Sequence, residues 1–273
     1  MNVLTNRFTK RVCGVLAVVT MLAAGPASAG PPLATDDTGL VDPGHLEVEI
    51  NGSYARDSER SGGVRTRTKA TDAEIKLSTG IMERMGVSLA LPYVFSERTY
   101  ENRRLVDSVD GLGDMLFEFK YVFYDNDALS FMLKPTLLIP TGKYRDGLSE
   151  GRWQPGVTLV ATKEFNDGKY ALHANAGYEY HSWRTAAAKA ENRNHLWMFS
   201  LAGEAEVAEK LTAVADFGVA RAGDRSTNTP AVYGLFGFRY EINNYLDINC
   251  GVKVGLTRPE DDVAALYGIV LKF

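Results

Sequence analysis

Apolar and polar residues alternate along most of the chain. The clearest example is "GDMLFEFKYVFY" (113–124), in which Phe117 and Phe119 alternate with Glu118 and Lys120. Successive side chains of a β-strand point to opposite faces, so a period of two indicates a strand with one apolar face and one charged face. Similar segments bring the expected total to about twelve strands, at 45–54, 71–79, 86–95, 128–140, 153–165, 169–182, 195–207, 211–221, 231–242, 245–256 and 263–273.

The connections between these segments alternate between short and long. Tight turns such as "NDG" (166–168) and "NN" (243–244) contain residues that turns favour. Longer polar loops lie between them, at 56–67, 98–111, 142–152, 184–194, 224–229 and 258–262. This asymmetry is typical of a transmembrane β-barrel with short periplasmic turns and longer extracellular loops. The sequence therefore predicts an all-β fold, an antiparallel transmembrane β-barrel of about 12 strands over residues 44–273.

The face opposite the apolar one carries acidic and basic residues together. If the apolar face meets lipid, this charged face lines the lumen. The lumen-lining candidates are Glu74, Lys76, Glu118, Lys120, Lys134, His173, Glu179, Asp216, Arg239 and Lys253.

The last strand ends at the terminal residue, Phe273. In lipid every backbone group needs an internal partner, so a β-protein that spans a membrane must close on itself. We therefore expect the last strand to pair with the first. A terminal phenylalanine is also similar to the signal by which the outer-membrane β-barrel assembly machinery recognises its substrates, so we expect that machinery as a partner.

The N-terminus has the features of a secretory signal. Arg7, Lys10 and Arg11 precede the apolar run "VCGVLAVVTMLAAG", and "ASA" (27–29) follows it. The run is shorter than the roughly 20 residues of a transmembrane helix. We expect residues 1–29 to be a cleaved signal peptide and the mature protein to reside in the bacterial cell outer membrane.

Residues 30–43 form an N-terminal periplasmic segment without strand or helix periodicity. One interpretation is a tail that hangs free in the periplasm. The alternative is a plug that folds into the barrel mouth, where Asp36 and Asp37 would pair with lumen bases such as Lys253 or Lys272.

Several stretches resemble one known family. "PPLATDDTGLVDPGHLEVE" (31–49), "DGLGDMLFEFKYVF" (110–123), "LKPTLLIPTGK" (133–143) and "QPGVTLVATKEF" (154–165) are similar to outer-membrane proteins named for the MetA-pathway of phenol degradation. The resemblance covers most of the mature chain. It implies an outer-membrane barrel and a transporter of hydrophobic or aromatic compounds, and it supplies no catalytic residues.

Charge and motifs exclude several other classes. The formal net charge of −4 argues against a nucleic-acid partner. "GLGD" (111–114) precedes a strand and not a helix, so it indicates no phosphate loop, and we expect no cofactor. The four histidines lack regular ligand spacing, so we expect no metal. Basic residues in 56–69 and 97–107 could bind the phosphates of lipopolysaccharide; the alternative is that they form a solvated surface. We expect outer-membrane lipid to surround the barrel in either case.

Catalysis has one weak candidate. His181 and Ser182 are adjacent, and neighbours on a strand point to opposite faces, so they cannot share a proton directly. We therefore expect no enzyme, and lipid hydrolysis is a distant third function. The favoured function is a channel or transporter for small, hydrophobic or aromatic solutes, because a barrel of about twelve strands is wider than one that side chains fill. The alternative is a structural or surface-interaction barrel without transport.

Overall fold

The computed structural model describes residues 31–126, 128–166 and 168–273, and the expected signal peptide lies outside them. The strands are β1 (Leu46–Ser61), β2 (Val64–Met82), β3 (Met85–Glu101), β4 (Arg104–Leu112), β5 (Met115–Asp125), β6 (Leu129–Ile139), β7 (Gln154–Phe165), β8 (Tyr170–Tyr180), β9 (His195–Ala208), β10 (Leu211–Ala220), β11 (Ala231–Asn243), β12 (Leu246–Gly255) and β13 (Val263–Lys272). A 3₁₀ helix, η1 (Tyr144–Asp146), and the short helix α2 (Ala186–Glu191) lie in loops. In the described part of the chain no helix has the length and apolar character to span a membrane.

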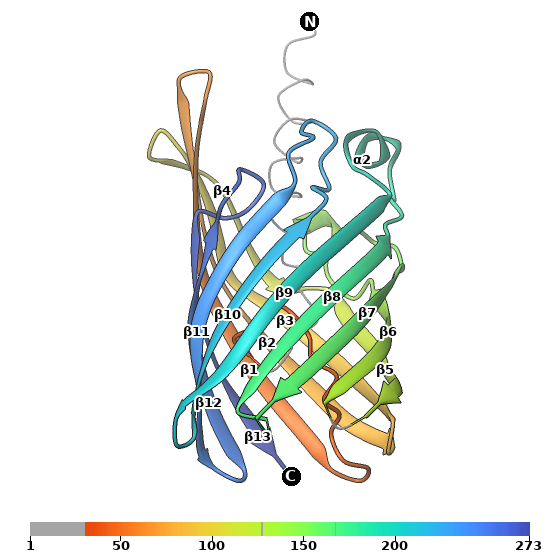
Figure 1. Ribbon diagram of the computed structural model, residues 1–273. Helices are drawn as coiled ribbons and strands as arrows, with labels where there is room; N and C mark the ends of the chain where they lie inside the picture. Colours follow the sequence, from red (N-terminus) through yellow and green to blue (C-terminus); the bar gives the residue numbers. More distant parts are fainter. Residues whose placement is uncertain (1–30, 127, 167) are drawn as a thin grey trace, which may run out of the picture.

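The strands form one closed antiparallel barrel (Figure 1). β3 pairs with β2 along one edge; along the other edge its upper half pairs with β4 and its lower half with β5. β4 and β5 therefore share one place in the wall, and the barrel has twelve positions, as predicted.

The ring closes between the first and last strands. β1 pairs with β13 from Glu47↔Lys272 to Arg56↔Val263. The Phe273 N–H donates to the Leu46 carbonyl oxygen at 2.8 Å, so the pairing continues to the last residue. The prediction that the terminal strand is covered by the first strand is confirmed.

The two faces of the wall differ as the alternation predicts. Large apolar side chains such as Phe117, Tyr121 and Phe123 lie exposed on the outside, whereas Glu118 between them is fully buried. A water-soluble protein would reverse this arrangement, so the outer face is suited to acyl chains.

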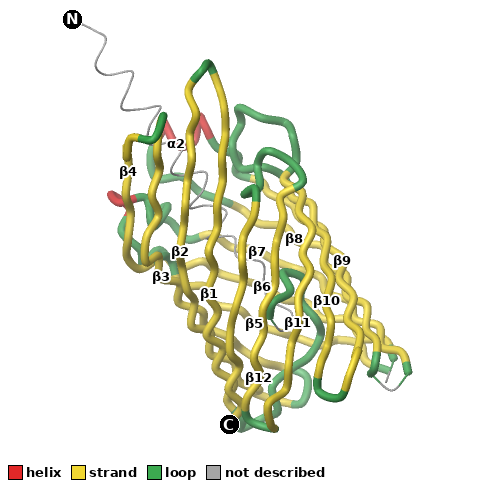
Figure 2. The backbone as a smooth tube through the Cα atoms, turned by 90° about the vertical axis from the view of Figure 1, so that its left-hand side faces the viewer, coloured by secondary structure: helices red, strands yellow, loops and turns green. Residues whose placement is uncertain are grey.

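Two predicted loops are strand instead. The segment 56–67 continues β1 and β2 to a tight turn at Gly62–Gly63, and 98–111 lies in β3 and β4, joined at Asn102–Arg103. All four turn residues have positive φ, as hairpin turns of this kind require. The β1–β2 hairpin projects beyond the rest of the wall (Figure 2). Both faces are polar there, which is why the sequence suggested loops.

Candidate functional site

The N-terminal segment occupies the interior of the barrel (Figure 1). Thr35 and Asp36 are at most 1% exposed, although no strand contains them. The free periplasmic tail is therefore the wrong interpretation of residues 31–38.

A chain of buried charges joins this segment to the wall. The Lys134 ammonium lies 2.5 Å from Asp36 and 3.1 Å from Glu118, and Glu118 lies 3.1 Å from Lys76. All four side chains are at most 3% exposed. Buried charges are tolerated when each lies beside a charge of opposite sign. Acidic and basic side chains alternate along this chain, so each of the four has such a neighbour. Glu74 and Lys120 lie in the electrostatic field of the same group.

The expected partners of the segment were wrong. Lys253 pairs with Glu260 at 2.9 Å and also lies 4.6 Å above the Tyr233 ring, and Lys272 pairs with Asp247 at 2.6 Å. Neither contacts Asp36. The Asp37 carboxylate accepts a bond from its own neighbour, the Gly39 N–H, at 2.6 Å.

Asp216 and Thr162 hold the segment at two further points. Asp216 accepts the N–H groups of Ala34 and Thr35, both at 2.8 Å, and the Thr35 hydroxyl at 2.7 Å. The Thr162 hydroxyl accepts the Thr38 N–H at 3.0 Å. The segment is thus tied to several strands by specific hydrogen bonds.

The remaining lumen candidates are held within the wall. His173 contacts Thr162 through Nδ1 at 3.0 Å, and Arg239 pairs with Glu204 at 2.7 Å. The Asn175 side chain contacts Asp36 inside the lumen. Sequence reasoning did not single out Thr162, Asn175 or Tyr233 as site residues. Thr162 and Asn175 lie at the alternate positions of their strands that face the lumen. A search of all lumen-facing positions, and not only of those with charged side chains, would therefore have found them.

The wall is interrupted between β4 and β5, at Gly113–Asp114. Among the described strands β4 has a partner on one edge only, because β6 ends at Ile139. The loop 140–153 folds across this break. The Asp114 carboxylate accepts the Gly142 N–H at 2.9 Å, and Leu148 packs on Val94 and Val109.

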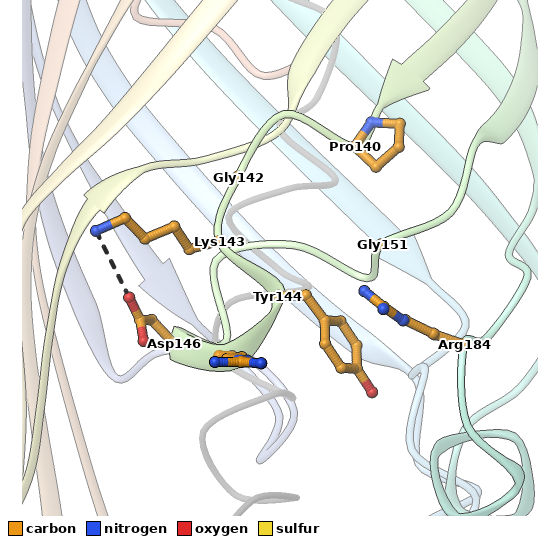
Figure 3. Close-up of a pocket in the computed structure, with 8 residues that line it drawn as sticks. Pro140, Gly142, Lys143, Tyr144, Asp146, Gly151 and Arg184 are labelled. Atoms are coloured by element: carbon orange, nitrogen blue, oxygen red, sulfur yellow. Dashed lines mark ion pairs between the residues drawn. The ribbon is translucent and has the colours of Figure 1, made fainter.

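An open pocket of about 450 Å³ lies where this loop meets the mouth (Figure 3). The Arg184 guanidinium lies 4.8 Å above the Tyr144 ring, and Lys143 approaches Asp146 at 3.8 Å. Its charged side chains Lys143 and Asp146 are exposed, so it is an open, solvated pocket and not an enclosed site.

Arg193 connects two outer loops. Its guanidinium is buried and donates to the carbonyl oxygens of Ala222, Asp224 and Thr227 and to the Asn228 side chain. It thereby fixes the loop before β9 against the loop after β10.

The histidine and serine considered for lipid hydrolysis have separate partners. His181 contacts Glu179 through Nε2 at 2.8 Å, whereas the Ser182 hydroxyl donates to the Trp153 carbonyl oxygen at 3.1 Å. Glu179 is an acidic partner that the sequence had not identified. The serine is nevertheless engaged elsewhere.

Residues 30–273 match the protein family described as "Putative MetA-pathway of phenol degradation". The chain belongs to this family. The resemblance seen in the sequence is thereby confirmed. Among curated proteins none matches the sequence significantly.

Solved structures of outer-membrane barrels are similar to this chain. The COG4313 outer membrane channel from Pseudomonas putida F1 has a TM-score of 0.73 at 14% identity, covering 90% of this chain and 100% of that one. The translocator domain of the autotransporter NalP from Neisseria meningitidis has a TM-score of 0.57 at 12% identity (95% and 98% covered). The Ralstonia pickettii toluene transporter TbuX has a TM-score of 0.50 at 11% identity (91% and 94% covered). At these identities the likeness shows the fold, that of an outer-membrane β-barrel, and the protein is placed in the outer membrane.

Proposed function

We propose that this protein is an outer-membrane channel for small hydrophobic or aromatic solutes. The observation that carries the proposal is the content of the lumen. A twelve-position wall encloses more space than its own side chains fill, and a separate segment of chain, 31–38, occupies that space. A segment held by hydrogen bonds and ion pairs can leave, whereas a packed wall cannot.

The family and a structural relative support the choice of solute. The family's description refers to phenol degradation, and TbuX is named a toluene transporter. Both point to small aromatic molecules. The polar hydrogen-bonded interior at Asp216 and Thr162 suits solutes that also carry a hydroxyl.

Two routes inward are compatible with the geometry. The straight route is crossed by Asp36, Lys134 and Glu118, so it requires the segment to move. A second route leaves through the wall at Gly113–Asp114, where loop 140–153 lies over the edge of β4 that has no strand partner among the described residues. An apolar solute would pass between the lumen and the outside of the barrel by that route without crossing the charges.

We also propose two partners for the channel, the β-barrel assembly machinery and lipopolysaccharide, and no catalytic activity. Phe273 at the end of β13 is the proposed signal for the β-barrel assembly machinery, and the projecting β1–β2 hairpin offers arginines to lipopolysaccharide. We infer no enzymatic activity, since Ser182 is bonded to a backbone carbonyl.

Planar-bilayer recording of the refolded mature chain, residues 30–273, tests the proposal. We expect unitary conductance, which phenol and toluene reduce while they occupy the lumen, and glucose as a polar control does not. The structural alternative would be favoured if the barrel shows no conductance and if vesicles that contain it take up phenol no faster than vesicles without protein.

A further inference from the structure

Glu97 on β3 is a buried carboxylate without a partner. Glu97 is 2% exposed, and neither carboxylate oxygen has a hydrogen-bond partner among the residues that the structure describes. A register shift between Val94 and Glu97 inserts the exposed Phe95, so that Val94 and Glu97 both point inward. A charged carboxylate in this position is costly, so Glu97 either holds a proton or takes its partner from a ligand.

The groups around Glu97 are also acidic. The charges of Asp107, Asp261 and Asp72 all act on it, from β4, the outer loop before β13 and β2. In the described part of the chain no basic side chain forms an ion pair with any of these four carboxylates. The lumen around Glu97 therefore carries acidic side chains that no ion pair between described residues neutralises.

The basic side chains nearest to Glu97 in β2 and β3 point away from the lumen. Lys69 and Arg98 flank Ala70 and Glu97 in sequence and pair directly across β2 and β3. Successive residues point to opposite faces, so these two cations lie on the outer face. Lys253 is engaged with Glu260 at 2.9 Å.

Apolar surface lies on both sides of Glu97. Its cross-strand neighbours are Ala70 and Val109. Ala70 packs with Ala55 and Ala264, and Val109 packs with Val94 and Leu148. One carboxylate thus lies between two apolar clusters that face the same lumen.

We propose that this region is a binding site for an organic cation, a protonated amine with an apolar body. Glu97 accepts the ammonium group, Asp72, Asp107 and Asp261 attract it, and the two apolar clusters contact its body. Among the described residues no group of three or more acidic, histidine or cysteine side chains is placed to hold a metal ion, so a larger cation fits the spread of charge better. Burial raises the pKa of Asp261; Lys253 opposes this, and Glu260 and Asp262 add to it.

The site deepens the proposed channel function, and its role in transport rests on that function. Binding and conductance are therefore measured separately. Calorimetry of the refolded chain in detergent at neutral pH uses benzylamine, which is protonated there, and benzyl alcohol as the neutral analogue of similar shape. The variants are Glu97→Gln and, on the outer face of β4, Asp110→Asn as the matched control.

We expect benzylamine to bind the parent protein and Asp110→Asn equally, and Glu97→Gln about tenfold more weakly, as loss of one charged contact implies. Benzyl alcohol should bind at least about tenfold more weakly than benzylamine. If Glu97→Gln does not refold, Asp107→Asn should show the same direction of change.

Equal affinity of benzylamine and benzyl alcohol, or an unchanged affinity in the folded Glu97 or Asp107 variant, would overturn the site. So would binding of Ca²⁺ without binding of benzylamine, because that result indicates a metal site. Bilayer recording separates the two proposals. A conducting channel that benzylamine does not block contradicts the cation site, and amine binding by a silent barrel contradicts the channel.

Discussion

The Lys134 ammonium lies 2.5 Å from the Asp36 carboxylate inside the barrel, and both side chains are almost completely buried. These residues are 98 positions apart in the chain, so the contact joins the N-terminal segment to strand β6. Lys134 also contacts Glu118 at 3.1 Å, so it retains an opposite charge if Asp36 is removed. The wall is therefore complete without the segment, whereas the segment depends on the wall.

Replacing Asp36 by asparagine should loosen the segment and leave the barrel folded. Breaking a buried charge pair costs about 3–5 kcal/mol, and here most of the cost falls on docking of residues 31–38. We expect higher or more frequent open conductance in planar bilayers, and a larger effect on deleting 31–39. Asp37→Asn is the matched control, because the hydrogen bond that its carboxylate accepts from a described residue, the Gly39 N–H, lies within its own turn. Equal effects of the two substitutions would contradict a specific role for the Asp36–Lys134 pair.

The outer face can be tested at Phe119, which shares it with the exposed Phe117 and Tyr121. Phe119→Arg would place a charge in the acyl chains and should destabilise the barrel by about 2–4 kcal/mol if it lies near the bilayer midplane. Urea titration of the protein folded into lipid vesicles measures this. Phe119→Leu keeps the face apolar and should remain close to the parent. An arginine variant as stable as the leucine variant would show that Phe119 does not face lipid.

Alternation was sufficient to predict the closed barrel of twelve positions and the two faces of a strand such as β5, but not the strands in 56–67 and 98–111. Each residue's parity decides whether it faces lipid or lumen, and closure at Phe273 follows from the need to pair every backbone group. The ion pairs were not predictable in the same way. Alternation shows which face of the wall a residue lies on. It does not show the residue's height along the barrel axis or which side chain lies opposite it across the lumen, so Lys253 and Lys272 were as plausible as Lys134 as the ion-pair partner of Asp36.

Glu97 shows a second limit of the sequence. The bulge at Phe95 reverses the parity of the upper half of β3, and nothing in "PYVFSERTY" (92–100) marks that reversal. The pattern of 98–111 also predicts a loop, because this segment lacks an apolar face. Above the membrane a strand needs no such face, since water and not lipid surrounds it.

Arg193 should keep the loop after β10 ordered without affecting the strands of the barrel. It donates to three carbonyl oxygens of the loop after β10, which an ammonium cannot match with the same geometry. Arg193→Lys should increase amide hydrogen exchange in 221–230 by about tenfold, the equivalent of about 1.4 kcal/mol, and leave exchange in the strands unchanged. Arg258→Lys, at an exposed position of another outer loop, is the control. Unchanged exchange in 221–230 would show that the loop is held by other contacts.

Loop 140–153 should respond to pH through Glu150. Burial raises the pKa of Glu150 to about 7 from an ordinary value of 4.5, and the nearby Asp114 adds to the shift. The docked loop therefore holds a proton that the open loop releases, so docking weakens as pH rises from about 4.5 to 7 and then levels off. The full change is at most about 3.4 kcal/mol, at 1.36 kcal/mol per pKa unit.

We expect amide exchange in 140–153, corrected for its intrinsic pH dependence, to be faster at pH 8 than at pH 5.5. Glu150→Gln keeps the uncharged form at every pH, so the loop should stay docked at pH 8 and lose this dependence. Asp146→Asn is the matched control, since Asp146 is exposed on the same loop and approaches Lys143 only at 3.8 Å. If Glu150→Gln retains the pH dependence of the parent, another group near the break at Gly113–Asp114 controls the loop, and the second route through the wall is gated by that group instead.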